Sequence, residues 1–432
     1  MLKYIFSNDK VRLKWSDVVI ALLFFAFGLF IFTQMYRIQV DMFWHLRSMT
    51  IVVFDKGRLF KPSYDAMTRI MSFFLGFCSR DTFGLGYVCF LSLMLTFKYI
   101  VLRSVTIDYF SRLGKPERAE LFALRAAIVL LCLGGHLIAF PQMISGYWQA
   151  DVLRLNVWHN PTTVALMPFG ILLFYFGLLT FKERTIKNFL ILAALVVLNF
   201  FSKPSYILAW VPAIFLTFAF LKIDEGGNFS ATFSLKRLLI ACAVAVPALT
   251  GIFFMKYVTK SVKENVIFSL PFAVQSHLLH IDFDRNINLI LERLAGRSFA
   301  AVKGSWQTFW YFVLYKPLTL LCGLAFPAAA FFISKKKKDA MLVFAWLTLL
   351  VSFAIAYTLS QDGVHRTHLN FTWQIPVAIS TLFLSSLLNF FSEEDNFPKM
   401  SWPAALTVGL FLLHAYSGLL YLQRLIFIWS WR

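Results

Sequence analysis

Long runs of apolar residues, separated by short polar segments, make up most of the chain. Eleven such runs occur, at 18–35, 83–101, 121–140, 162–181, 188–201, 205–221, 238–255, 317–333, 340–358, 374–390 and 403–422. A helix that crosses a bilayer needs about 20 consecutive apolar residues, and most of these runs approach that length. The pattern therefore predicts an all-α polytopic membrane protein with about eleven transmembrane helices in a single domain, 1–432. The short run 188–201 and the next one predict a tight helical hairpin around Lys203 and Pro204.

The composition agrees with a membrane protein. Of the 432 residues, 59% are hydrophobic and only 15% are charged, and the mean hydropathy is +0.70. Because a soluble domain carries about a quarter charged residues, a soluble protein is excluded. The net charge is +19, but Lys and Arg occur in short clusters between the apolar runs, which indicates membrane-flanking charge and no nucleic-acid partner. The five cysteines lie within apolar stretches without a C-x-x-C pair, which is typical of packing residues.

The positions of Lys and Arg predict the orientation. Short loops rich in Lys and Arg stay on the cytoplasmic side, and with a cytoplasmic N-terminus the inward loops are 102–119, 182–187, 222–237, 334–339 and 391–400. The first apolar run has no small-residue cleavage site after it, so we expect a retained helix and not a signal peptide. Abundant Phe and little Arg favour a bacterial plasma (inner) membrane, with an internal eukaryotic membrane as the alternative.

Most chemically versatile side chains fall in the outward loops of this topology. These loops are 36–82, 141–161, 202–204, 256–316 and 359–373. His136 and His414 are exceptions, since each lies in an apolar run, where a satisfied core histidine is the simpler interpretation. We therefore expect the functional site on the periplasmic or extracellular face.

The first outward loop follows directly after the first apolar run. Asp41 and His45 are four residues apart there and share a face if the stretch is helical. A carboxylate at the membrane boundary is either a helix cap or partner of Arg47, or a general base facing a cavity. Two further stretches, 44–54 and 63–77, mix apolar and basic residues and are broken at Gly57 and Pro62, which predicts interfacial helices.

An acidic residue after the first helix, interfacial helices, and the residues Gly57, Pro62 and Tyr64 together resemble the GT-C superfamily of integral-membrane glycosyltransferases. The turns Asn160-Pro161-Thr162 and Lys203-Pro204-Ser205 add to this resemblance. Members of that superfamily transfer a sugar from a polyprenyl-phosphate donor on the outer face of the membrane. The resemblance implies that Asp41 is the catalytic base, with His45 as its orienter or as an alternative base.

One departure from that family concerns metal. The family often has two acidic residues in its first loop, whereas here Gln39 and Phe43 flank Asp41 at a spacing of two. This favours a metal-independent enzyme without a cofactor. The pattern of His277, His280, Asp282 and Asp284 looks like a metal site, but without a fourth ligand at a known spacing we rank structural or acceptor-facing roles above it.

Sugar transfer from a lipid phosphate also needs cations that stabilise the departing phosphate. We assign this role to four residues, His365, Arg366, His368 and Lys203. The alternative for Arg366 is an anchor in the interfacial belt beside Trp373, although an anchor does not explain the two histidines.

A sugar-binding wall is the prediction for the stretch that ends at Asn160, where aromatic and polar residues alternate. Aromatic rings stack on pyranose faces, and amides and carboxylates bind hydroxyls. The assigned substrate-binding residues are Asp151, Trp158, His159, Asn160 and Asn370. The alternative is an interfacial aromatic belt with a helix cap at Asn160, and it is at least as well supported.

Three functions from different classes follow from these observations. The first is a glycosyltransferase that moves a sugar from a lipid-linked donor to a glycan, lipid or protein acceptor. The second is a polymerase or ligase of lipid-linked polysaccharide repeats, which typically relies on outward arginines. The third is a transporter or flippase of lipid-linked saccharides, ranked last because few ionisable residues fall in the middle of the runs. Walker, dinucleotide, zincin and serine-hydrolase motifs are absent from the sequence.

Overall fold

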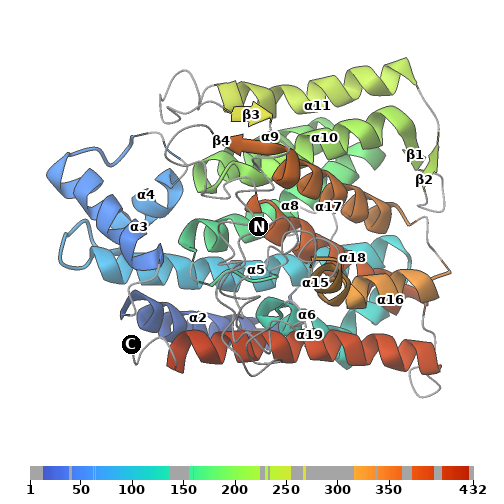
Figure 1. Ribbon diagram of the computed structural model, residues 1–432, viewed down its shortest axis with the longest axis horizontal. Helices are drawn as coiled ribbons and strands as arrows, with labels where there is room; N and C mark the ends of the chain where they lie inside the picture. Colours follow the sequence, from blue (N-terminus) through green and yellow to red (C-terminus); the bar gives the residue numbers. More distant parts are fainter. Residues whose placement is uncertain are drawn as a thin grey trace, which may run out of the picture.

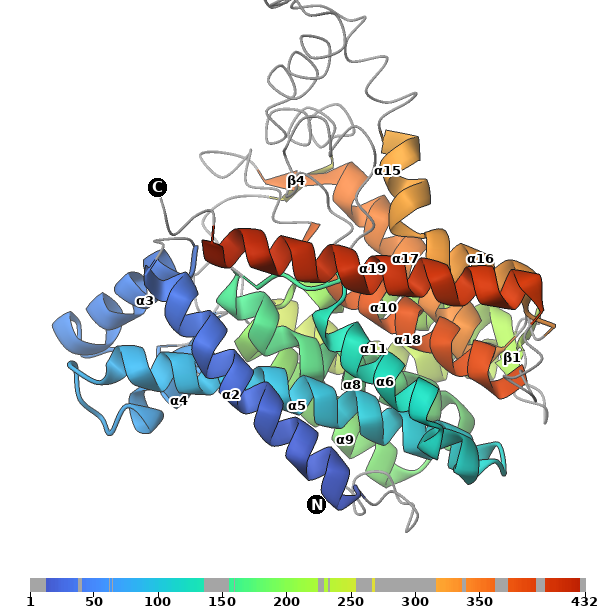
Figure 2. The same ribbon diagram turned by 90° about the horizontal axis from the view of Figure 1, so that it is seen from below.

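The computed structural model is a bundle of roughly aligned helices (Figures 1 and 2). It describes residues 13–37, 41–61, 63, 65–135, 155–158, 160–223, 229–231, 234–253, 266–268, 316–335, 339–361, 372–393 and 401–427. Within these ranges, six helices are long and apolar enough to cross a membrane: α2 (Trp15–Arg37), α5 (Phe83–Arg112), α8 (Pro161–Lys182), α17 (Ala340–Thr358), α18 (Ile375–Glu393) and α19 (Trp402–Phe427). The protein is therefore a helical membrane protein, and the count of eleven spans stays a prediction.

Every apolar run of the sequence contains helix, but several helices are short. α6 (Phe122–Leu133), α9 (Ile186–Ser202) and α10 (Ser205–Phe220) have 12, 17 and 16 residues. The run 317–333 forms two helices, α15 (Lys316–Gly323) and α16 (Ala325–Ile333), and the run 238–255 corresponds to α11 (Leu235–Phe253). At a rise of 1.5 Å per residue, α6 covers only about 18 Å, roughly half of the hydrocarbon core.

α5 continues beyond the apolar run that predicted it. Residues 102–112 were expected in an inward loop because Arg103 and Asp108 interrupt the apolar pattern, but they complete the helix. Both charged side chains are buried and paired: Arg103 with Asp17 of α2 (3.1 Å), and Asp108 with Arg112 (2.7 Å). A charged residue with a partner inside a bundle does not end a helix, and for this reason hydropathy alone placed the boundary too early.

The two stretches predicted as interfacial helices are helical, and their place in the membrane interface stays a prediction. α3 (Asp41–Thr50) runs into the π-helical turn η1 (Ile51–Asp55), and α4 (Ala66–Leu75) follows. Gly57 lies between them with a φ of +59°, a conformation that L side chains rarely adopt. α3 and α4 lie at one end of the bundle, and the strands β1 (Leu221–Ile223) and β2 (Phe229–Ala231) lie at the other (Figures 1 and 2).

Two short antiparallel pairs of strands depart from the all-α prediction. β1 pairs with β2, and β3 (Val266–Phe268) pairs with β4 (Leu359–Gln361). Each strand has three residues, so the periodicity of the sequence carries no signal for it. The strands connect ends of helices and leave the helical core unchanged.

The middle of the bundle is formed by α8 and α18. Nearly every side chain of both helices is buried, whereas α2 and α19 keep exposed Leu, Phe and Tyr side chains along one side. Exposed apolar side chains of this kind suit contact with lipid chains. Buried side chains on all faces of α8 and α18 instead identify them as internal helices that position the residues at their ends.

Candidate functional site

Lys203 is the centre of the candidate site. It lies in the two-residue turn between α9 and α10, so the predicted hairpin turn is confirmed. Its side chain is buried, with only 9% exposed, and Pro204 follows it as the N-cap of α10. The Lys203 Nζ donates to Asn160 Oδ1 and to Thr163 Oγ1, each at 3.1 Å.

The indole of Trp373 covers the remaining side of the ammonium group. Lys203 Nζ lies 3.7 Å from the centroid of the Trp373 ring, which is a close cation–π contact. An ammonium group has three N–H donors, and here two meet oxygen atoms and the third side meets the ring face. The site thus holds a cation with two neutral acceptors and an aromatic ring.

Asn160 organises the other side of the site as the N-cap of α8. Its Oδ1 accepts from the Thr163 backbone N–H (3.1 Å) and from the hydroxyls of Thr162 and Thr163 (both 2.9 Å). The helix cap expected at this residue is confirmed. The positive end of the α8 dipole therefore points towards the same place as the Lys203 ammonium, and together they favour a negatively charged ligand.

Asp41 and His45 lie close to this cation on α3. Asp41 is the first residue of the helix and is exposed, while His45 is half-buried one turn later. Asp41 interacts electrostatically with both Lys203 and His45, and Lys203 also acts on His45. The helical arrangement predicted for the pair is confirmed, and Arg47, the alternative partner of Asp41, instead contacts the ring of Trp44.

The surroundings shift the pKa of both basic groups. Burial lowers the pKa of Lys203 well below its ordinary value, and the attraction of Asp41 opposes this effect. Burial also lowers the pKa of His45, the repulsion of Lys203 adds to it, and the carboxylates of Asp41 and Asp65 oppose it. An anion that binds beside Lys203 restores the preference for the charged amine.

Trp158 occupies a different environment from the one expected of a sugar-binding wall. It is 2% exposed and packs on Phe27 and Phe32 of α2, with ring centroids 6.2 and 6.4 Å away. Its assignment to substrate binding stays a prediction. The remaining assigned residues lie outside the described ranges: Asp151, His159, His365, Arg366, His368 and Asn370.

The other histidines and acidic residues that the sequence singled out also lie partly inside and partly outside the described ranges. His414 is buried in α19, and its Nδ1 lies 3.1 Å from the carbonyl oxygen of Gly135, as expected of a satisfied core histidine. His136 and the 277–284 cluster lie outside the described ranges. Over the residues that the structure does describe, no three His, Cys, Asp or Glu side chains come together as a metal site, and metal independence stays a prediction.

A second buried lysine was not anticipated from the sequence. Lys98, near the middle of α5, is 3% exposed and donates to Asn156 Oδ1 at 2.5 Å. Asn156 in turn donates to the carbonyl of Gly134 at 2.6 Å, just beyond the last residue of α6. The signal in the sequence was a single lysine near the end of the long apolar run 83–101, which is costly unless it has a polar partner.

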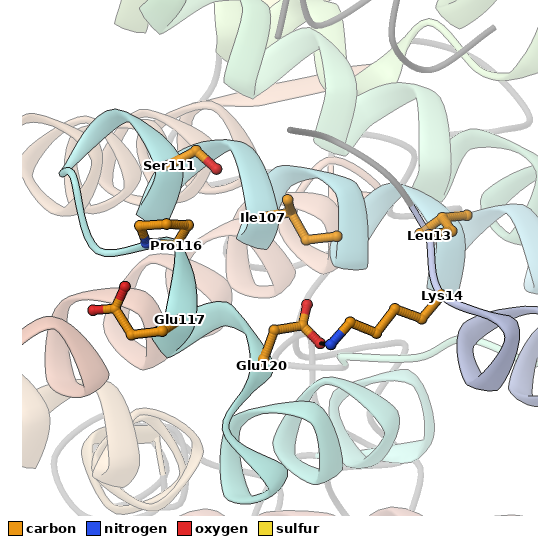
Figure 3. Close-up of a pocket in the computed structure, with 7 residues that line it drawn as sticks. All are labelled: Leu13, Lys14, Ile107, Ser111, Pro116, Glu117 and Glu120. Carbon is orange, nitrogen blue, oxygen red and sulfur yellow. Dashed lines mark ion pairs between the residues drawn. The ribbon is translucent and has the colours of Figure 1, made fainter. Parts of the chain in front are cut away.

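A cavity of about 370 Å³ lies at the opposite end of α5 from the candidate site (Figure 3). Its walls include Leu13, Lys14, Ile107, Pro116 and Glu120. Lys14 and Glu120 form an ion pair at 2.7 Å beside it. The cavity is distant from Asp41 and Lys203 along α5, so it is not part of the candidate site.

No family model matches the chain, and no curated protein and no solved structure matches it.

Proposed function

We propose that the protein is a membrane glycosyltransferase that takes a sugar from a polyprenyl-phosphate donor and transfers it on the non-cytoplasmic face. The observation that carries this proposal is that a buried Lys203, bonded to two neutral acceptors, and an exposed Asp41 that acts on it electrostatically lie at the same end of the bundle. A cation and a carboxylate in that arrangement supply the two charges that the reaction requires.

In the proposed reaction, the acceptor hydroxyl oxygen forms a bond to the anomeric carbon while the bond from that carbon to the phosphate oxygen breaks. Asp41 accepts the hydroxyl proton, and its exposure leaves room for an acceptor. The lipid phosphate leaves with the bonding electron pair and gains negative charge, which Lys203 and the amino end of α8 stabilise. A phosphate oxygen replaces the Trp373 ring as the third partner of the ammonium group.

The test is sugar transfer by purified protein incubated with a panel of polyprenyl-phosphate sugars, with release of the lipid phosphate as the measurement. Asp41→Asn should abolish transfer but leave lipid-phosphate binding intact, and Lys203→Met should weaken that binding. Asp55→Asn, which alters an exposed carboxylate on the same loop paired with Arg80, is the matched control. Full turnover by Asp41→Asn excludes its role as the base, and turnover that depends on added Mg²⁺ or Mn²⁺ excludes the metal-independent form.

A transporter of lipid-linked saccharides is the second candidate, and a specific observation favours it. Transporters place ionisable residues and interrupted helices near the middle of the membrane, and Lys98 beside the end of the short helix α6 has both properties. Reconstituted vesicles distinguish the two functions. Movement of a labelled lipid-linked saccharide across the bilayer that is equal in Asp41→Asn and in the unaltered protein supports transport.

A further inference from the structure

The segment Leu155–Asn160 connects the two buried lysines. Asn156 lies near its beginning and accepts from Lys98, and Asn160 lies at its end and accepts from Lys203. In each case the acceptor is the amide oxygen of an asparagine and the donor is an ammonium group with little exposure. Two contacts of the same kind, at different depths of the bundle, are therefore made by residues four positions apart.

The depth difference follows from α5. Tyr87 near its beginning donates to the Met42 carbonyl of α3 at 3.3 Å, which fixes the level of the Asp41 end of the bundle. Lys98 lies eleven residues further along α5, about 16 Å deeper at 1.5 Å per residue. Asn156 is thus held inside the bundle, at the level of Lys98, and Asn160 lies at the candidate site, at the level of Lys203.

Lys98 is linked to the carboxyl end of α6 through Asn156. The last carbonyls of a helix lack partners and carry partial negative charge. Asn156 Nδ2 donates to two carbonyls there, Gly134 at 2.6 Å and Leu131 at 3.4 Å, while its Oδ1 accepts a hydrogen bond from Lys98 Nζ. Lys98, linked to this helix end by the Asn156 amide, therefore holds α6 and the segment Leu155–Asn160 in place.

Two further contacts hold the same segment from other sides. Ser380 of α18 donates to the Leu155 carbonyl at 3.1 Å, and Trp158 packs against α2. None of these side chains contacts Lys203 directly. Their shared effect is to fix the position from which Asn160 reaches the turn between α9 and α10.

We propose that Lys98 is a positioning residue for the candidate site, which acts by holding Asn156 and through it the segment that presents Asn160 to Lys203. The inference rests on the proposed function only for its consequence in lipid-phosphate binding, because the holding of the segment can be measured separately. Without the Lys98 ammonium group, Asn160 shifts relative to Lys203, and the cation loses its alignment with the amino end of α8.

The first measurement is hydrogen–deuterium exchange of the purified protein, followed in peptides that cover residues 155–163. Lys98→Met should raise exchange there and leave peptides from α17 unchanged. Thr106→Val is the matched control, because Thr106 is also buried in α5 but bonds only within its own helix, to the Leu102 carbonyl. Lys98→Gln keeps an N–H donor, so it should restore part of the protection, and it also serves if Lys98→Met does not fold.

The second measurement is binding of a polyprenyl monophosphate in detergent. Lys98→Met should lower the affinity by about tenfold or more, since displacement of a binding group by an ångström has effects of this size. Unchanged exchange at 155–163, or a rise equal to that of Thr106→Val, overturns the proposal. The proposal is also overturned if Lys98→Met raises exchange but leaves the affinity for polyprenyl monophosphate unchanged, while Lys203→Met lowers that affinity. If Lys203→Met itself leaves the affinity unchanged, the proposed function fails, and the exchange result alone decides the role of Lys98.

Discussion

The burial of Lys203 affects both the stability of the protein and its affinity for an anion. Burial disfavours its ammonium form, so between the lowered folded-state pKa and the ordinary value the folded protein binds fewer protons than the unfolded chain. Stability therefore rises with pH through that interval. Affinity for an anion shows the opposite trend, because the neutral amine does not attract phosphate.

These opposite trends give a prediction for Lys203. As pH rises from neutral towards the ordinary lysine pKa, we expect the unaltered protein to gain thermal stability while its affinity for polyprenyl monophosphate falls. Lys203→Met should weaken both dependences, because the contribution of this titrating group is gone. Thermal unfolding and lipid-phosphate binding measured over the same pH series check this, and a parallel fall of both quantities in the unaltered protein would contradict it.

The Trp373 ring competes with an anion for Lys203 in our proposal. A desolvated cation–π contact contributes about 2 kcal/mol, which a ligand must replace when it displaces the ring. We therefore expect Trp373→Leu to bind polyprenyl monophosphate more tightly, by up to about thirtyfold, and to unfold at a lower temperature. Trp158→Leu removes a ring that packs on α2, so it should lower stability without tightening the binding of polyprenyl monophosphate. Weaker binding by Trp373→Leu would instead assign the indole to the ligand.

At the scale of elements, the crossing of α6 and α19 depends on two glycines. A Cβ atom on Gly418 would lie 2.2 Å from the Leu133 carbonyl oxygen, and one on Gly135 would lie 2.7 Å from the Gly418 Cα. Backbone atoms cannot give way as a flexible side chain does, so the helices would have to separate. The end of α6, which Asn156 caps, would move with them.

Gly418→Ala is the corresponding prediction. We expect it to destabilise the protein by about 1–3 kcal/mol, the usual cost of overpacking, and to raise hydrogen exchange near the end of α6. Gly409→Ala on the same helix is the control, since nothing lies within 4 Å of its added Cβ, and a gain in helix propensity should leave it at least as stable. Equal stability of the two variants, measured by thermal unfolding in one detergent, would contradict the role of this contact.

The elements also differ in how well the sequence predicted them. Long apolar runs located the helices because burial in lipid or in the bundle requires apolar side chains on most faces. The break between α15 and α16, the early end of α6 and the extension of α5 to Arg112 were not predicted. The last two depend on tertiary partners that lie far away in the sequence, Asn156 at the end of α6 and Asp17 beside Arg103.

For the candidate site, the sequence supplied residues but not their grouping. Asp41, His45, Asn160 and Lys203 were chosen from separate loops, and the structure brings them to one end of the bundle. Thr163 was missed because a threonine in the first turn of a helix has an unremarkable sequence pattern, and Lys98 was missed because the sequence does not show which distant residue is its partner. Hydrogen bonds to side chains 40 and 58 residues away give them their place.

At the scale of the whole molecule, the two ends of the bundle are built differently. The end with Asp41 combines an exposed carboxylate with a buried cation that has only neutral acceptors. The other end is a network of closed ion pairs, in which Asp17 accepts from Arg103 at 3.1 Å, from Arg125 at 2.9 Å and from Tyr99 at 3.1 Å. Paired charges join α2, α5 and α6 there, so we assign that end to structure and the Asp41 end to function.

Asp17→Asn tests this division. Asp17 is fully buried and accepts from two guanidinium groups, both of which also contact Glu120, so we expect removal of its charge to cost about 1–3 kcal/mol. Arg80→Gln breaks the exposed pair with Asp55 and should cost about 1 kcal/mol or less. Because the network lies beyond Lys98 on α5, the Asp17→Asn protein that remains folded should bind polyprenyl monophosphate with unchanged affinity. Unfolding in detergent and lipid-phosphate binding, measured on the same preparation, separate the effect on stability from the effect on affinity. If Asp17→Asn lowers the affinity more than Lys98→Met does, the ligand binds at the Asp17 end of the bundle and not at the Asp41 end.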